Sequence, residues 1–522
     1  MYRLKQTKLS IDKKFFILIF SFFLIIFVFT NDGHRFTFDE DVATQQSKRI
    51  ATMSPDPSYV QGQSRLLFEY PWLFPPEHNM RPICQNAILC SMGNIAHSLT
   101  QVPLIFLNHN FHFIPTSNLW SVEDFDDFHY VSWRNDVDPD FTFMELFYGP
   151  IFSALSTGVF FLLARSFGFA IKTSIIITVL LGLSTFLWAY SQTSLNAVPF
   201  TFFILLGLLL YKKYQMCGSY RFLTMCGVSF GLAFLTRNDA ILFIIPIFVF
   251  LLIGIAKKNY RVKSFFSFVI PVSMSYVIYK ILEFVRFGPR TDPDTALVAP
   301  AQIANAAFSN PYFLQIFGIL FSPGAGIFVY NPVLLLSFIG FYDFYKKNKS
   351  DCILLIILSS IMILIYSAGS YWHGFNGWGP RYLVPILPLL LLPIAASIEK
   401  RKSLFFKISL ISLGVIGFLI NIVYLLQDVS WFVWGFLGSD ERGLYSLARK
   451  ADGNVYDLWI NPIIIWSPEY NQLTQSIFWL ISKPQIDLFL LKIFGSSLYL
   501  LSLFSLLSVP FFFIIKFIKK YQ

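Results

Sequence analysis

Residues 240–256 read AILFIIPIFVFLLIGIA, and the basic stretch KKNYRVK follows directly at residues 257–263. An apolar run without charges that ends in several Lys and Arg residues is typical of a helix that crosses a membrane and stops at its cytoplasmic face. Comparable runs recur along the whole chain. Because a crossing needs about 20 residues, we predict about 12 membrane-spanning helices, near residues 15–30, 146–164, 171–190, 197–211, 222–236, 240–256, 264–283, 325–343, 352–368, 382–398, 404–426 and 490–515.

The composition also predicts a membrane protein. Hydrophobic residues make up 55% of the 522 residues and charged residues only 13%, whereas charged residues make up roughly 25% of an ordinary soluble domain. A soluble protein of this length would lack the polar surface that it needs. The sequence therefore predicts an all-α, polytopic membrane protein in which residues 1–522 form one membrane domain, without a soluble nucleotide-binding part.

The charged residues are distributed unevenly along the chain. The net charge is +10, but Lys and Arg gather in short segments between the apolar runs, which argues against nucleic acid as a partner. By the positive-inside rule these basic segments are cytoplasmic. Residues 31–144 instead hold 14 Asp or Glu and 6 Lys or Arg. We therefore predict an acidic first outer loop with short helices at residues 31–144, and two cytoplasmic termini.

Other outer segments and the first apolar run complete the predicted topology. Residues 427–487 are rich in Trp and Tyr, which indicates a layer lying on the outer membrane surface. Residues 15–29 lack a small-x-small cleavage pattern, so we interpret them as an uncleaved anchor rather than a signal peptide. The predicted outer segments have no Asn-x-Ser/Thr sequon, which favours the inner membrane of a bacterium.

Two patterns in the first loop have competing interpretations. Cys84 and Cys90 could form a disulfide outside the cell or remain two free thiols, and no Cys/His spacing resembles a zinc site. Asp-x-Asp matches occur between Asp124 and Asp140 and are typical of soluble sugar-nucleotide transferases. Because such matches arise easily in an acidic stretch, we interpret them as solvated loop.

The first loop opens with the acidic run Phe38-Asp39-Glu40-Asp41. The residues that follow predict a helix, and acids at a helix N-terminus are favourable simply because they oppose the helix dipole. A carboxylate held at the membrane surface could also take a proton from an acceptor hydroxyl. Both interpretations fit the sequence pattern.

Five short motifs occur in order with a shared outer placement: Asp39-Glu40, Thr236-Arg237-Asn238-Asp239, Arg286-Phe287-Gly288, Ser322-Pro323-Gly324-Ala325-Gly326-Ile327-Phe328 and Gly379-Pro380-Arg381-Tyr382. Together they resemble the polytopic GT-C class of glycosyltransferases, which includes protein mannosyltransferases and aminoarabinose transferases. The resemblance covers most of the chain. It implies transfer of a sugar from a polyprenyl-phosphate carrier to an acceptor, not identified by the sequence, on the outer face.

The same resemblance implies roles for the two acids. Asp39 would be the general base, and Glu40 would orient the acceptor or a metal. No cofactor is certain, and a divalent metal is the one that the resemblance leaves open. One departure stands out, because chains of this class often carry an acid just after the third span, whereas residues 190–197 contain none.

Two arginines are candidates for binding the carrier phosphate. Arg237 and Arg381 lie at the outer ends of predicted spans, where a guanidinium is costly unless it meets an anion, and Arg binds phosphate through two parallel hydrogen bonds. The alternatives are snorkelling to the interface or pairing with a nearby acid such as Asp239. We expect both arginines to converge on one outer pocket beside Asp39. Further candidates for substrate binding are Asp239, Arg286, Trp372, His373 and Trp378.

Two other classes of function compete with the enzyme. A transporter or flippase of lipids or small molecules would line its path with intramembrane charges, but few predicted spans carry a charge at mid-depth. A non-catalytic scaffold is the third class. An Asp39→Asn variant that folds but loses activity would separate the enzyme from both.

Overall fold

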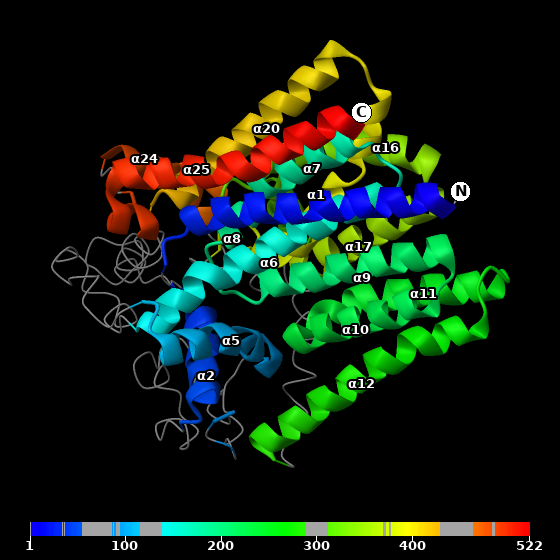
Figure 1. Cartoon of the computed structure of the whole chain (residues 1–522), viewed down its shortest axis with the longest axis horizontal. Coiled ribbons are helices and arrows are strands. Elements are labelled where there is room, and N and C mark those ends of the chain that lie inside the picture. The colour runs from blue at the N-terminus through cyan, green and yellow to red at the C-terminus, as the bar shows by residue number, and fades with distance from the viewer. Residues whose placement is uncertain are drawn as a thin grey trace.

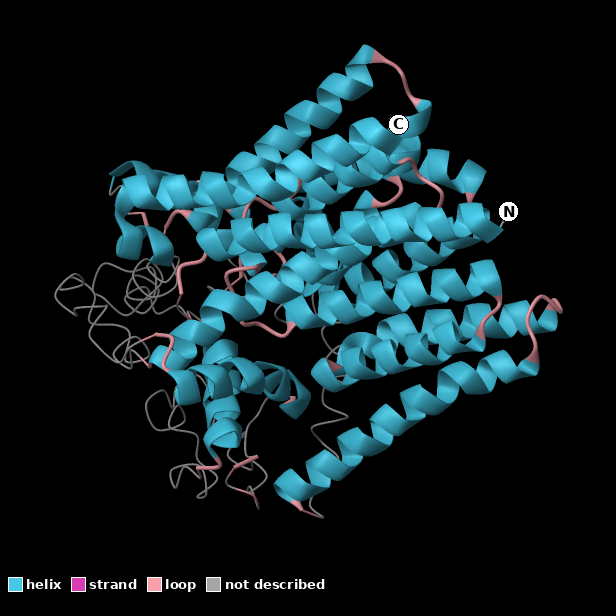
Figure 2. Ribbon diagram, viewed as in Figure 1, coloured by secondary structure: helices cyan, strands magenta, loops and turns pink. Residues whose placement is uncertain are grey.

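The computed structural model describes residues 2–33, 35, 37–54, 86, 88–89, 94–114, 138–288, 312–368, 372–374, 377–427, 463–482 and 486–521. Within these ranges every regular element is helical, and no strand occurs (Figure 2). The prediction of an all-α protein is therefore confirmed. Cys84 and Cys90 lie outside the described residues, so their predicted pairing stays open.

Eight described segments are long and apolar enough to cross a membrane, judged by length and composition. All eight coincide with predicted spans. They are α6 (Pro139–Ser166), α9 (Ala197–Cys217), η4 with α11 (Asn238–Ala240 and Ile241–Ala256), α12 (Val262–Phe287), α17 (Lys349–Ser367), η6 with α18 and α19 (Arg381–Ile386, Leu387–Leu391 and Ile394–Lys400), α20 (Leu404–Leu425) and α25 (Phe489–Tyr521).

Several other predicted spans correspond to shorter or mixed helices. α1 (Tyr2–Phe29) contains the first apolar run, and α7 (Ile171–Leu183) and α10 (Tyr220–Thr236) are apolar but shorter than a full crossing. A further apolar helix, α14 (Tyr312–Phe321), lies between the predicted spans at residues 264–283 and 325–343. The protein is thus a multi-pass membrane protein by its apolar helices, and the total of about 12 crossings stays a prediction.

Besides residues 382–398, which hold η6, α18 and α19, two further predicted spans are not single helices. Residues 171–190 form α7 and α8 (Leu187–Tyr190), separated by a break in which the Phe186 N–H donates to Asn331 Oδ1 at 2.8 Å. Residues 325–343 hold α15 (Ile327–Tyr330), η5 (Pro332–Leu336) and the start of α16 (Ser337–Lys347). Asn331, which is followed by a proline, interrupts this second segment. Its side-chain oxygen accepts the Phe186 N–H that the first break leaves without a helical partner.

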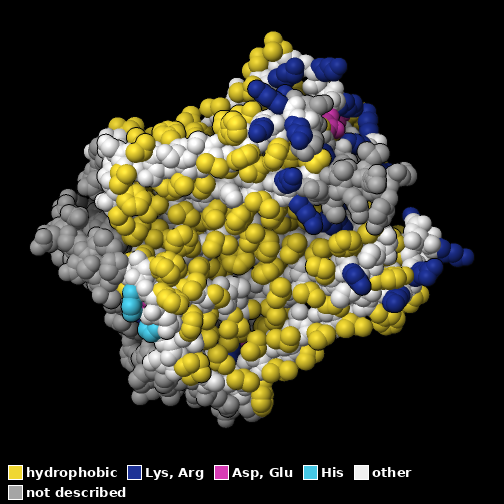
Figure 3. Space-filling view, in the orientation of Figure 1, with side chains coloured by type: hydrophobic (Ala, Val, Ile, Leu, Met, Phe, Trp, Pro, Cys, Tyr) yellow, Lys and Arg dark blue, Asp and Glu magenta, His cyan; other side chains and the backbone are white. Residues whose placement is uncertain are grey.

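The helices run between two ends of the bundle that differ in chemistry. Both termini lie at one end, and α2 (Phe38–Thr52) and α5 (Ile95–Phe111) lie at the other (Figure 1). Lys and Arg side chains gather on the end that holds the termini, while a broad hydrophobic surface covers the middle (Figure 3). We call these the basic end and the site end. The shared end of the two termini fits the predicted topology, whose orientation in the membrane stays a prediction.

α1 packs one side against the core of the bundle. Phe15, Phe23 and Phe27 are fully or almost fully buried, and the Phe15 ring lies 5.8 Å from that of Phe161 in α6. A Cβ atom added to Gly182 would lie 2.1 Å from the Phe23 ring, so the glycine makes room for that side chain. The predicted anchor is therefore also part of the hydrophobic core.

The first loop contributes α2 and α5, which pack against the start of α6. Ser47 Oγ in α2 lies 2.7 Å from Gln101 Oε1 in α5. Lys48 in α2 forms ion pairs with Asp138 and Asp140 at the start of α6. Asp140 is buried and also accepts from Asn108 Nδ2 at 2.9 Å. The interpretation of the Asp-x-Asp pattern as solvated loop is therefore wrong for Asp140, which connects three helices.

Part of the predicted interfacial segment is also described. It contains α23 (Ile463–Trp466) and α24 (Gln472–Ser482), and in α24 the side chains of Ile477, Phe478 and Ile481 are exposed. An exposed apolar face is what a helix lying in a membrane surface requires. Residues 428–462 lie outside the described part of the chain.

The cysteines give a test of orientation. Cys217 is exposed where α9 ends at the basic end, whereas Cys84 and Cys90 belong to the predicted outer loop. In intact cells, after reduction, a membrane-impermeant maleimide should label Cys84 or Cys90 but not Cys217. Cys217 should react only after permeabilisation. Labelling of Cys217 in intact cells would mean that the basic end faces outward.

Candidate functional site

The site begins at the first turn of α2, where Asp39 and Glu40 point to different surroundings. Thr37 caps the helix: the Glu40 N–H donates to Thr37 Oγ1 at 3.3 Å, and the Thr37 N–H donates to Glu40 Oε2 at 3.0 Å. This reciprocal pair is a capping box and fixes where the helix starts. The Asp39 side chain is 52% exposed, whereas Glu40 is fully buried.

Glu40 connects α2 to the segment after α8. Its Oε1 accepts from the Ser194 N–H at 3.0 Å, while Oε2 accepts from Thr37. Because both carboxylate oxygens already bind protein groups, this position favours holding Asp39 in place over contacting an acceptor or a metal. The role of Glu40 that the resemblance implied stays a prediction.

Arg381 joins Asp39 at the start of η6. Its Nη1 lies 2.8 Å from Asp39 Oδ2, and its guanidinium carbon lies 5.2 Å from the centre of the Tyr382 ring. Gly374 has a φ of +84°, and a Cβ there would lie 2.9 Å from Arg381 Cγ. A residue without a side chain therefore lets this loop lie directly on the arginine stem.

Arg237 reaches the same tyrosine from the end of α10. Its guanidinium carbon lies 5.7 Å from the centre of the Tyr382 ring, and the Tyr366 ring stacks on Tyr382 at 4.6 Å. Arg237 also donates from Nε and Nη2 to the two oxygens of Asp239, at 3.1 and 2.7 Å. The structure thus brings the two arginines to one ring, with Asp39 in contact with one of them.

Ser194 connects two buried acids, Glu40 and Glu145. Its Oγ donates to Glu145 Oε1 at 2.7 Å, while its N–H donates to Glu40. Glu145 is 1% exposed and lies in the second turn of α6, and its Oε2 has no partner in the described structure. The sequence analysis missed Glu145, although a single acid within an apolar run is a signal for a functional position.

His97 in α5 binds the other side of Ser194. His97 Nε2 lies 2.8 Å from the Ser194 carbonyl oxygen, so Nε2 must carry the proton because a carbonyl can only accept. Burial lowers the pKa of His97 from 6.5 to about 4; the charge of Arg237 adds to this, while the Ser194 hydrogen bond and Asp39 oppose it. His97 is therefore neutral at physiological pH, and the charges of Asp39 and Arg237 influence its pKa.

The remaining candidates lie around this centre in different settings. Arg286 pairs with Glu283 at 2.7 Å and donates to the Leu89 carbonyl at 3.2 Å. Trp372, His373 and Trp378 are all buried. The Trp372 ring lies against Gly318 and the Trp378 ring packs against Tyr330 and Tyr424, so both indoles contact protein here.

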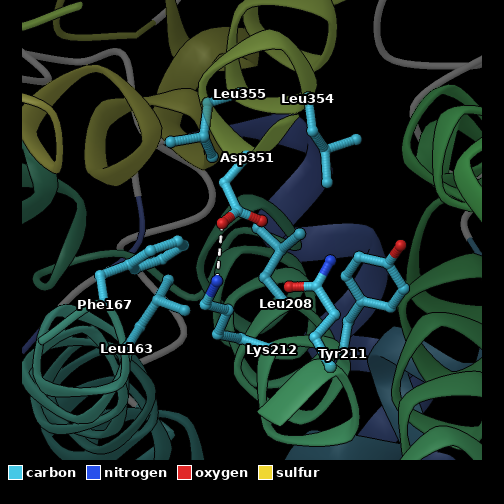
Figure 4. A pocket seen from close by; sticks show the side chains of 9 residues that line it. Leu163, Phe167, Leu208, Tyr211, Lys212, Asp351, Leu354 and Leu355 are labelled. Carbon is cyan, nitrogen blue, oxygen red and sulfur yellow. Dashed lines mark hydrogen bonds and ion pairs between the residues drawn. The ribbon is translucent and has the colours of Figure 1, made fainter. Parts of the chain in front are cut away.

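The residues of the site do not form a metal centre in the part of the chain that the structure describes. Among the described residues, no group of three or more His, Cys, Asp or Glu side chains is arranged to hold a metal ion. The divalent metal therefore stays a prediction. The pocket in Figure 4 lies at the basic end, where Lys212 of α9 pairs with Asp351 of α17 at 2.6 Å, and it is not part of the arginine and acid cluster.

The fold and the site define an all-α, multi-pass membrane protein with a network of acids, arginines and tyrosines at one end of its bundle. No protein-family model matches the chain, and no curated protein matches it. The resemblance to GT-C glycosyltransferases therefore remains a prediction from the motifs.

The buried His97 predicts how stability depends on pH. The unfolded chain protonates this histidine near pH 6.5 and the folded chain only near pH 4, so its full contribution is present above pH 6.5. That contribution should fall as the pH drops from 6.5 towards 4, by about 2 kcal/mol at pH 5. Thermal unfolding in detergent at pH 7 and pH 5 measures the loss.

Two variants separate His97 from other titrating groups. His97→Gln keeps a donor for the Ser194 carbonyl and should lose clearly less stability than the wild type between the two pH values. His112→Asn, at an exposed side chain whose positive φ of 49° Asn tolerates, should keep nearly the wild-type pH dependence. An equal loss in wild type and His97→Gln would contradict the assignment.

Proposed function

We propose that the protein transfers a sugar from a polyprenyl-phosphate carrier to an acceptor hydroxyl at the site end of the bundle. The observation that carries this proposal is the half-exposed Asp39 carboxylate in contact with the largely buried guanidinium of Arg381. The exposed Asp39 carboxylate can take a proton from an acceptor hydroxyl, and the adjoining Arg381 guanidinium can bind the leaving phosphate. The GT-C resemblance of the motifs supports the same reaction.

In the proposed reaction the acceptor oxygen attacks the anomeric carbon of the sugar. The bond between that carbon and the phosphate oxygen breaks, and the phosphate leaves with the electron pair. The acceptor proton passes to Asp39. Positioned donors for the developing negative charge are commonly the largest contribution to such catalysis, and Arg381 and Arg237 would supply them.

The charge balance of the cluster supports a coupling between proton transfer to Asp39 and departure of the phosphate. Arg381 is paired with Asp39, and Arg237 with Asp239, so the four side chains together are neutral. Once Asp39 accepts the proton it no longer neutralises Arg381. The positive charge of Arg381 then becomes available at the moment when negative charge develops on the leaving phosphate.

Arg237 is held more tightly than Arg381. Its guanidinium donates to both oxygens of Asp239 and to the Tyr366 hydroxyl, and its carbon lies 5.2 Å from the Phe200 ring centre. Such anchoring fixes the direction of the charge, which suits a residue that receives an anion without moving. We therefore assign Arg237 to orienting the phosphate and Arg381 to responding to proton transfer.

The first test of this proposal removes the base. Asp39→Asn keeps the shape of the side chain but cannot accept the proton, so sugar transfer by purified protein should fall roughly 10²- to 10⁴-fold. Binding of the lipid-linked donor should remain. Asp351→Asn breaks the ion pair with Lys212 at the basic end and serves as the matched control.

The outcome of this test separates the classes of function. Near-normal turnover by Asp39→Asn would exclude Asp39 as the base. A wild-type protein that transfers no sugar from any polyprenyl-phosphate donor, yet moves lipid between leaflets of a vesicle, would be a transporter instead.

The second test changes the cation. Arg381→Lys keeps the charge but loses the planar fork that can bind Asp39 and a phosphate together. Charged hydrogen bonds contribute about 1.5–3 kcal/mol, so kcat/KM should fall roughly ten- to hundredfold. Arg401→Lys, which alters a 2.6 Å pair with Asp343 at the basic end, should change kcat/KM little. Equal effects of the two substitutions would remove Arg381 from the reaction.

A further inference from the structure

The Tyr190 hydroxyl is an unusual buried donor beside Arg381. Tyr190 ends α8 and is 2% exposed, yet its hydroxyl has no hydrogen-bond partner in the described structure. Other buried tyrosines do have partners: the hydroxyl of Tyr148 lies 2.6 Å from Thr100 Oγ1, and that of Tyr214 lies 2.6 Å from Ser264 Oγ. A buried polar group without a partner is costly and indicates a missing ligand or water.

Arg381 carries a second unpartnered donor at the same place. Its Nη1 binds Asp39 and its Nη2 lies 3.4 Å from the Tyr382 hydroxyl, but its Nε is buried without a partner. Gly377 lies against both side chains: a Cβ added there would be 2.5 Å from Tyr190 Oη and 2.9 Å from Arg381 Cβ. Arg381 Cδ, the carbon that carries Nε, lies 3.4 Å from the same point, so the Tyr190 hydroxyl and the end of Arg381 that bears the second donor adjoin one glycine.

An anionic oxygen would satisfy both donors. Arg381 alone is a weak anion receptor while Asp39 neutralises it, so a neutral donor beside it adds attraction without adding a competing charge. A carboxylate or carbonyl of the protein could also have filled this place, but none does in the described residues. The chemistry of the pair matches a non-bridging oxygen of a phosphate.

We propose that the Tyr190 hydroxyl and Arg381 Nε together bind the phosphate group of the lipid-linked donor, with Tyr190 as a binding residue. This inference rests on the proposed function, since it assigns the group that Tyr190 recognises in that substrate. Tyr190 holds the phosphate in the ground state, before Asp39 has accepted a proton. Its loss therefore weakens donor binding first.

Binding of small phosphates to the purified full-length protein in detergent tests the proposal. The probes are geranyl phosphate and inorganic phosphate, and the readouts are calorimetry and the rise in thermal stability on adding each probe. Tyr190→Phe should weaken binding of geranyl phosphate about tenfold or more, as expected for a hydrogen bond to a charged group. Tyr214→Phe, at a buried and hydrogen-bonded tyrosine of the basic end, should bind like the wild type.

Stability without ligand separates a binding role from a structural one. Tyr190→Phe removes a hydroxyl that has no partner, so its unfolding temperature should equal or exceed that of the wild type. Tyr214→Phe leaves Ser264 without its partner and should unfold at a lower temperature. A Tyr190→Phe protein that binds geranyl phosphate as the wild type does would overturn the proposal, whether or not it is destabilised.

The remaining outcomes are equally decisive. Failure of the wild type to bind either probe, or binding of inorganic phosphate alone, would overturn the assignment to a lipid-linked phosphate. Tyr190-dependent binding of geranyl phosphate supports it. If that binding is found but the wild type transfers no sugar, the proposed function fails and the phosphate site stands.

Discussion

A backbone inside a lipid bilayer must satisfy its polar groups within the protein, and this constraint shapes both the fold and the site. Where α7 ends, the Phe186 N–H finds Asn331. After α8, the Ser194 N–H finds Glu40, and Asn31 Nδ2 donates to the carbonyls of Glu145 and Ser191 at 3.2 and 3.4 Å. Each of these backbone groups is thus satisfied by a side chain from a distant part of the chain.

The breaks are also what present chemistry at the site end. An unbroken helix through residues 171–190 would have carried Tyr190 onward on a regular helical face. Because the chain breaks before α8 and again after it, Tyr190 lies beside Arg381, and Ser194 contacts Glu40, Glu145 and His97. The same hydrogen bonds that make the irregular backbone tolerable therefore position the polar groups.

Much of the fold could be predicted from hydrophobicity alone. All eight described segments able to cross a membrane coincide with predicted apolar runs, since burial in lipid leaves a strong signal in composition. The break before α8 could not be predicted, because the partner of Phe186 is 145 residues away. Local sequence near residue 186 carries no trace of Asn331.

The site was predictable only in part, because some of its residues are connected only in the folded chain. Motif order placed Asp39, Arg237 and Arg381 among the candidates, and the structure brings Asp39 and Arg381 into contact. His97 was missed because its partner Ser194 reaches it only in the folded chain, whereas Glu145 did leave the signal of a single acid in an apolar run. Glu40 was a candidate from its place beside Asp39. The sequence could not show that both of its carboxylate oxygens bind protein groups.

The seating of α1 limits how this protein can be engineered. Phe16 and Phe23 face Gly158 and Gly182, where an added Cβ would lie 2.7 and 2.1 Å from their rings. The Phe23 ring is almost fully buried, and replacing such a buried Phe by Ala typically costs about 3–5 kcal/mol. An N-terminal segment borrowed from another membrane protein would supply hydrophobicity and a direction of insertion. It would not supply the matching bulk, so exchangeable leader sequences are unsuited to this chain even when their length and hydropathy are the same.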